Sequence, residues 1–218
     1  MFLGHFGVAL GSKKMVPEIS LGLLFISALF LDLLWPTLLL LNLEKVEINS
    51  ASGNITPLNF THYPYSHSLV MVMLWSLLFG FICWLFTRNK RTGFILGLLV
   101  LSHWVLDLVV HIPDLPIYPG DSPLLGFGLW KSLVTTIVIE GFIFIVGIIL
   151  YLRATRAKNK IGSIGFWIFI VFLTGIYIIN LSSPPPPSVN TIAWAGQLQW
   201  ILVLFAFWVD RNRKSLPE

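Results

Sequence analysis

Histidine and aspartate side chains that could bind a metal ion or transfer protons lie close together in one segment, 101–114, with the sequence LSHWVLDLVVHIPD. Four residues make slightly more than one helical turn, so His103, Asp107 and His111 fall on one face of a helix, each about 6 Å above the last. A His/Asp pair at this spacing can bind one metal ion, and ionisable groups inside an apolar span mark a functional site by default. The alternative is a polar seam that hydrogen-bonds neighbouring helices.

Composition restricts both the class of protein and the kind of site. The chain has 218 residues, of which 56% are hydrophobic and 11% charged, and its mean hydropathy is +0.83. Soluble domains carry about 25% charged residues, so we expect an integral membrane protein. Its single cysteine, Cys83, excludes a disulfide framework and a cysteine-based zinc site. Any metal site must therefore use histidine and carboxylate ligands. The net charge of +4 is spread over short segments, which argues against a nucleic-acid partner.

Six apolar stretches have spanning length, about 20 residues. They are 19–42, 67–87, 93–111, 130–152, 163–181 and 191–209. Residues 1–12 are apolar but too short to span, and we expect a short re-entrant or interfacial helix there. The sequence therefore predicts an all-α membrane protein with about six transmembrane helices, forming a single domain over residues 1–218.

Basic residues indicate the orientation of this bundle, because cytoplasmic loops carry an excess of lysine and arginine. With a cytoplasmic N-terminus, the outer side, including segments 43–66, 112–129 and 182–190, holds only Lys45 and Lys131. The inner side then holds Lys13, Lys14, Arg88, Lys90, Arg91, Arg153, Arg156, Lys158, Lys160, Arg211, Arg213 and Lys214. This asymmetry predicts that both termini are cytoplasmic.

Polar residues of separate spans then fall at similar depths. Asp107 lies about 21 Å up the third span, and Asp32 lies at the same height in the first. His67 opens the second span at the outer surface, and Glu140 in the fourth falls near the level of His103. We therefore expect a polar layer in the outer half of the bilayer, facing outward. The glutamines of the last span, Gln197 and Gln199, are interpreted as residues that hydrogen-bond between helices rather than as substrate ligands.

His5 can join this polar layer only if residues 1–12 re-enter the membrane. Eight helical residues counted back from Lys13 would lift it about 12 Å, close to the level of His103. Such a segment is tolerated at membrane depth only where it packs within protein or lines water.

Four short motifs, taken in order, resemble a known family. They are GH at residues 4–5, LDLLWP at 31–36, HYPYSHSL at 62–69 and SHWVLD at 102–107. Their order resembles the bacterial and archaeal inner-membrane metal-dependent hydrolases described as LexA-regulated. The pattern of that family is similar to G-H, P-D-I-D-H-P, H-R-G-x-T-H-S-L and S-H-x-x-x-D. The resemblance implies metal-site residues at the matching positions, which are His5, Asp32, His62, His67, His103 and Asp107. A fainter likeness is to zinc phospholipase C.

The chain departs from this pattern at two places. Leu34 and Trp35 replace the second aspartate and the histidine of the second motif, and Tyr63-Pro64 replaces Arg-Gly in the third. We therefore expect one metal ion, or a degenerate site, in place of a full multinuclear centre.

The favoured function is metal-dependent hydrolysis of an ester or phosphoester in a lipid or amphiphile that enters from the outer leaflet. The metal is expected to be a divalent ion, zinc first, with manganese or iron as alternatives. His62, His111 and Glu140 are the candidates for moving protons. The proline-rich outer segment 112–129 is long enough to act as a lid over the site.

Two other classes of function remain open from the sequence. A proton- or ion-coupled transporter would use intramembrane Asp and His equally well, but it should show paired halves or broken helices, and the sequence indicates neither. The other alternative is a non-catalytic membrane scaffold with a vestigial metal site. For the favoured function and for both alternatives, we expect the protein to lie in a prokaryotic inner (plasma) membrane.

Overall fold

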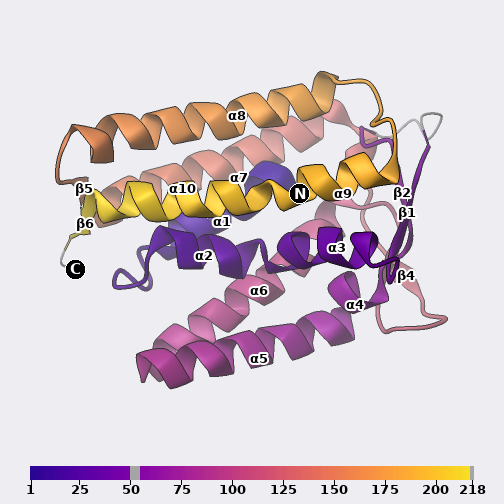
Figure 1. Ribbon diagram of the computed structural model, residues 1–218, viewed down its shortest axis with the longest axis horizontal. Helices are drawn as coiled ribbons and strands as arrows, with labels where there is room; N and C mark the ends of the chain where they lie inside the picture. Colours follow the sequence, from indigo (N-terminus) through magenta and orange to yellow (C-terminus); the bar gives the residue numbers. More distant parts are fainter. Residues whose placement is uncertain (50–54, 217–218) are drawn as a thin grey trace.

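The computed structural model describes residues 1–49 and 55–216, and it is 68% helical with only short strands. In this part of the chain five helices are long and apolar enough to cross a membrane, and a bent pair makes a sixth candidate. They lie side by side as a bundle (Figure 1), which confirms the predicted fold class. The five are α5 (Leu69–Thr87), α6 (Lys90–Val110), α7 (Leu133–Ala154), η2 with α8 (Ile161–Gly165 and Phe166–Ser182), and α9 with α10 (Val189–Gln197 and Gln199–Arg211).

The two ends of the bundle differ in charge and in structure. One end carries the turn between α5 and α6 and the strand pair of β5 (Thr155–Ala157) with β6 (Arg213–Ser215), and most basic residues lie in these segments or within a few residues of them along the chain (Figure 1). The other end carries two antiparallel hairpins. This separation agrees with the charge asymmetry of the sequence, and membrane orientation itself stays a prediction. The hairpins are β1 (Lys45–Ile48) with β2 (Leu58–His62), and β3 (Leu115–Pro116) with β4 (Leu124–Leu125).

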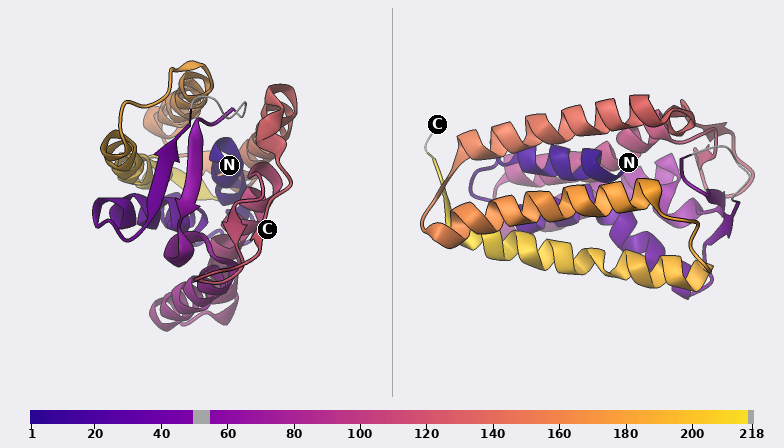
Figure 2. Two further views of the ribbon diagram at one scale, coloured as in Figure 1. Left: turned by 90° about the vertical axis from the view of Figure 1, so that its right-hand side faces the viewer. Right: turned by 90° about the horizontal axis from the view of Figure 1, so that it is seen from above.

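The short helix α1 (Phe2–Ser12) lies among the long helices (Figure 2), and most of its residues are buried. Its backbone touches that of α7. A Cβ atom on Gly7 would lie 2.7 Å from the Ile143 carbonyl oxygen, and one on Gly147 would overlap the Gly7 carbonyl. Glycine at both positions permits this close approach. This packing among the long helices agrees with the re-entrant alternative and carries His5 toward the middle of the bundle.

The prediction of one continuous helix over 19–42 is wrong. The segment forms α2 (Leu21–Ala28) and α3 (Phe30–Leu40), which are bent by 59° relative to each other. Leu29 lies at the break with φ −101° and ψ 9°, away from helical values. Because of this break, α3 begins directly after the end of α2, and Asp32 lies in the first turn of α3.

Pro36 adds a second irregularity to α3. Proline has no backbone N–H, so the carbonyl of Asp32, one turn earlier, lacks its usual helical partner. Gln199 Nε2 donates to that carbonyl at 3.3 Å, and Gln197 Nε2 donates to Thr37 Oγ1 at 2.9 Å. The interpretation of both glutamines as residues that hydrogen-bond between helices is confirmed.

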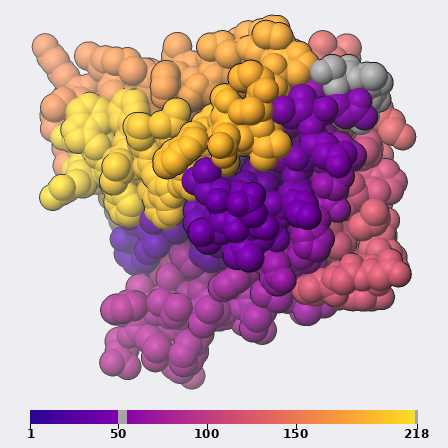
Figure 3. Space-filling model, turned by 45° about the vertical axis from the view of Figure 1, so that its right-hand side comes forward, coloured from indigo at the N-terminus to yellow at the C-terminus, as the bar shows by residue number. Residues whose placement is uncertain are grey.

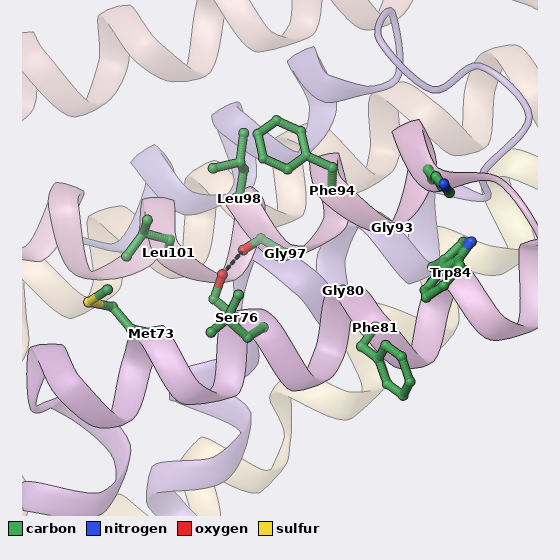
Figure 4. Close-up of a pocket in the computed structure, with 12 residues that line it drawn as sticks. Met73, Ser76, Gly80, Phe81, Trp84, Gly93, Phe94, Gly97, Leu98 and Leu101 are labelled. Carbon is green, nitrogen blue, oxygen red and sulfur yellow. Dashed lines mark hydrogen bonds between the residues drawn. The ribbon is translucent and has the colours of Figure 1, made fainter.

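The hairpin of α5 and α6 holds the segment that contains His103 and Asp107. Gly80, Gly93 and Gly97 let the two helices approach until a Cβ on Gly97 would lie 2.8 Å from the Ser76 carbonyl oxygen. Ser76 Oγ also donates to the Gly97 carbonyl at 2.7 Å (Figure 4). This contact fixes the position of α6 against the bundle.

Candidate metal centre

Four helices bring histidine and aspartate side chains to one buried place. In the described part of the chain two groups could hold a metal ion, Asp32 with His67 and His103, and His5 with His103 and Asp107. The ligand atoms within each group lie within 4.8 Å of one another. The residues come from α1, α3, α6 and the one-turn helix α4 (Pro64–His67), which lies between β2 and α5. His103, shared by both groups, is fully buried.

The separations around His103 suit a single tetrahedral ion. From Asp107 Oδ2 the distance is 3.1 Å to His103 Nε2 and 3.8 Å to His67 Nε2. From Asp32 Oδ1 the same two nitrogens lie at 3.6 and 3.9 Å. Ligands about 2.0–2.1 Å from a tetrahedral zinc ion are about 3.3 Å apart. The four carboxylate–nitrogen distances are close to this spacing, and the four residues belong to the two overlapping groups of three that share His103. Their N and O donors suit zinc, manganese or iron.

The break between α2 and α3 fixes the orientation of His103. Its Nδ1 lies 2.8 Å from the carbonyl oxygen of Ala28, which can only accept a hydrogen bond, so Nδ1 carries the proton. Nε2 is buried and makes no hydrogen bond with any described residue, although it is 3.1 Å from Asp107 Oδ2. A backbone carbonyl behind a ligating imidazole is a usual device for fixing its tautomer. Nε2 therefore faces the other ligand atoms, and in the neutral imidazole its lone pair is directed at them.

A chain of hydrogen bonds behind His67 fixes the orientation of its imidazole. Glu44 Oε1 accepts the backbone N–H groups of Tyr65 and Ser66, each at 2.8 Å, and Glu44 Oε2 accepts the Ser66 hydroxyl at 2.6 Å. Because the single Ser66 proton goes to Glu44, Ser66 Oγ accepts from His67 Nδ1 at 2.7 Å. This leaves His67 Nε2 unprotonated and directed toward Asp32 and the other ligand atoms.

Asp107 connects His5 to the other residues. Its Oδ1 lies 3.1 Å from His5 Nε2 and 2.6 Å from the amino group of Met1, while its Oδ2 faces His103. The His5 and His103 rings stack with centroids 3.7 Å apart and planes 9° from parallel. His5 thus joins the cluster, as the re-entrant position of α1 requires. From here on, the metal cluster means His5, Asp32, His67, His103 and Asp107.

The metal cluster opens onto a cavity of about 190 Å³, the metal cavity, which is lined in part by Asp32, His67, Asp107 and His111. Asp32 has a side chain that is 31% exposed, which makes it the most accessible of the four candidate ligands Asp32, His67, His103 and Asp107. Trp35, which stands where the resembled pattern has histidine, forms part of the wall. An indole in that position fits the expectation of fewer metal ligands than the full pattern provides.

The cover of the metal cavity differs from the expected one. Among the described residues, Thr56, Leu58 and Phe60 of the first hairpin and Trp130 line its outer side, whereas none from 112–129 does so. The expectation of a lid made by 112–129 is therefore wrong. Figure 3 shows the hairpin segment, in purple, between the orange-yellow residues of α9 and the pink segment that follows α6.

The three candidates for proton transfer lie in different surroundings. His111 lines the metal cavity, and its Nδ1 donates to Asp114 Oδ1 at 2.9 Å. Tyr63 donates to the same oxygen at 3.1 Å, and burial, with the nearby Asp114 charge, raises the pKa of this phenol, which therefore stays protonated. His62 lies at the exposed end of β2 opposite Lys45 and outside both metal-binding groups. The resemblance implied that His62 is a metal-site residue, but the structure does not place His62 in the metal cluster.

Glu140, the third candidate, lies beside the start of α1 rather than in the metal cluster. Its side chain is 2% exposed and lies near the backbone N–H groups of Leu3 and Gly4. A carboxylate at a helix N-terminus satisfies free N–H groups and the helix dipole. This contact ties α7 to the helix that carries His5.

Sequence reasoning did not find the residues that orient the ligands. Glu44 lies outside every predicted span, and Ser66 is one residue of the motif at 62–69. The adjacency of Ser66 to His67 was the available signal, since a ligating histidine needs a hydrogen-bond acceptor for its other ring N–H. The Ala28 carbonyl had no signal, because its availability depends on the break at Leu29.

The fold and the metal cluster together define an integral membrane protein with a buried His/Asp centre that could hold a metal ion. The model of the YdjM inner membrane protein family matches residues 3–183, and the chain belongs to that family. The match includes all five residues of the metal cluster and ends at α8. No curated protein and no solved structure matches the chain.

Proposed function

We propose that the protein is a metal-dependent hydrolase that cleaves an ester or phosphoester bond in a lipid or amphiphile. The observation that carries this proposal is the set of carboxylate–imidazole distances of 3.1–3.9 Å among Asp32, His67, His103 and Asp107, three of which line the metal cavity. Asp32, His67, His103 and Asp107 would hold one ion, with zinc the first choice. When bound, a divalent metal polarises the scissile group and lowers the pKa of a coordinated water.

The residues of the metal cavity supply the remaining parts of a hydrolytic site. Asp32 faces the space that a substrate would enter, and His111 lies on the same wall. Nδ1 of His111 is hydrogen-bonded to Asp114, so Nε2 of His111 is the nitrogen that can exchange a proton with the leaving group. The buried carboxylate of Asp107 fixes the imidazole of His5 beside that of His103. His62 has no role in this scheme, because it is exposed and outside the cavity.

The substrate would arrive from the outer side of the inner membrane. The metal cavity lies under the β1–β2 hairpin, at the end of the bundle opposite the basic segments. By the positive-inside rule those segments face the cytoplasm, so the hairpin end faces out. Aromatic side chains of Trp35, Phe60 and Trp130 in the wall suit an amphiphile more than a small hydrophilic solute.

Transport is the second candidate function, and one observation favours it. The α2–α3 pair is a broken span with Asp32 just after the break, and broken helices form ion sites in many transporters. A metal ion held there would then be cargo rather than cofactor.

An assay in proteoliposomes tests both candidates. With p-nitrophenyl esters and p-nitrophenyl phosphodiesters as probes, we expect hydrolysis that EDTA abolishes and zinc restores. Asp32→Asn should lower it by more than about 100-fold, since even partners behind a ligand are worth about 10- to 100-fold. Asp121→Asn, a matched change at an exposed position, should keep wild-type activity. Metal uptake into the vesicles without hydrolysis of any probe would refute the hydrolase and support transport.

A further inference from the structure

A second and larger cavity, of about 430 Å³, lies beside the metal cavity. We call it the chain cavity. The two cavities share Phe2, Thr56, Leu58 and Trp130 as lining residues, so they are neighbours with a common wall. The chain cavity lies among α7, α8, α9 and the segment before β2, and its volume is within the usual range for a small-molecule site.

The lining of the chain cavity combines apolar side chains with two buried polar atoms. Glu140 Oε2 and the Tyr177 hydroxyl have no hydrogen-bond partner among the described residues, although these residues are only 2% and 6% exposed. Both line the cavity. A buried polar atom without a partner costs about 1–3 kcal/mol, so two of them in one cavity point to a ligand that bonds to them.

The chemistry of the two groups restricts that ligand. A hydroxyl group can donate to a Glu140 oxygen and accept from the Tyr177 phenol at the same time. An anionic group would meet the Glu140 carboxylate and be repelled. The surrounding Phe2, Leu181 and Ile192 side chains suit a hydrocarbon chain.

We propose that the chain cavity binds an uncharged, hydroxyl-bearing amphiphile, with its hydrocarbon chain among α7, α8 and α9 and its hydroxyl between Glu140 and Tyr177. The identification of this molecule as the substrate, or as the alcohol released from the substrate, rests on the proposed hydrolase function. The binding of the molecule in the chain cavity does not depend on that function. Phe2 stacks on Tyr177 with centroids 6.3 Å apart and planes 5° from parallel. It therefore separates the hydroxyl site from the metal cavity.

Photolabelling of metal-free protein tests the binding directly. The protein, treated with EDTA in nanodiscs, is exposed to a ten-carbon alcohol that carries a diazirine or to the corresponding carboxylic acid, and labelled peptides are quantified by mass spectrometry. We expect the alcohol to label α8 and α9 peptides at least 10-fold more than the acid does. Tyr177→Phe and Glu140→Gln should each reduce labelling by the alcohol several-fold, and Glu140→Gln should increase labelling by the acid.

Tyr118→Phe is the matched control, because Tyr118 is 44% exposed on the outer segment and far from this lining. It should label as the wild type does. Equal labelling by alcohol and acid, or wild-type labelling of folded Tyr177→Phe, would overturn the proposal. Because the assay uses metal-free protein, absent hydrolysis with selective alcohol labelling would refute only the proposed function.

Discussion

Replacing His103 by alanine is expected to abolish metal binding by the purified protein. His103 Nε2 is the ligand atom shared by both metal-binding groups and lies within 3.6 Å of both carboxylates. Its loss should weaken metal affinity by more than about 100-fold, because even partners behind a ligand contribute about 10- to 100-fold. Elemental analysis of the protein after zinc loading and dialysis measures this effect.

The matched control for His103→Ala is His62→Ala. Both remove an imidazole, but His62 is exposed at the end of β2 and outside the metal cluster. We expect His62→Ala to retain wild-type metal content. Circular dichroism and gel filtration should first establish that the His103 variant is folded. A folded His103→Ala protein that binds as much zinc as the wild type would show that this cluster is not the metal site.

The second large effect is expected for Asp107→Asn, which keeps the shape of the side chain and removes its charge. Asp107 is 2% exposed, forms a buried ion pair with the amino group of Met1 at 2.6 Å, and lies 3.1 Å from His5 and His103. Breaking a buried charge pair costs about 3–5 kcal/mol, so we expect a large fall in thermal stability in nanodiscs. Metal binding should fall as well, because an amide is a poorer ligand than a carboxylate.

EDTA separates the two consequences of Asp107→Asn. Metal that binds only the folded protein stabilises it, so EDTA should lower the melting temperature of zinc-loaded wild-type protein. The variant should melt lower in the absence of metal and show no further shift with EDTA. Asp121→Asn should respond as the wild type does. An Asp107→Asn protein with the wild-type EDTA shift would contradict the role of Asp107 as a ligand.

The sequence was sufficient to predict the bundle and the centre of the metal cluster. Span positions follow from hydropathy alone, because a membrane requires about 20 apolar residues per helix. The spacing of His103 and Asp107 places both on one helical face whatever the surroundings. Similar depth then brought Asp32 and His67 into the prediction, and the structure places all four together.

The remaining features depend on tertiary contacts that no local pattern records. No glycine or proline lies within residues 23–35 around the break at Leu29, and only its 59° bend makes the Ala28 carbonyl available to His103. The packing of α1 depends on Gly7 meeting Gly147, which are 140 positions apart in the sequence. The cover of the metal cavity was assigned to the wrong outer segment, because prolines at 112–129 indicate a loop but not where it lies.

The most direct test of the central claim is the metal content of the wild-type protein. After purification without chelators, loading with zinc and extensive dialysis, elemental analysis should find one zinc ion per chain, and X-ray absorption should show a shell of nitrogen and oxygen ligands at about 2.0–2.1 Å. Sulfur in that shell, or folded protein without stoichiometric zinc, manganese or iron, would contradict a His/Asp metal centre.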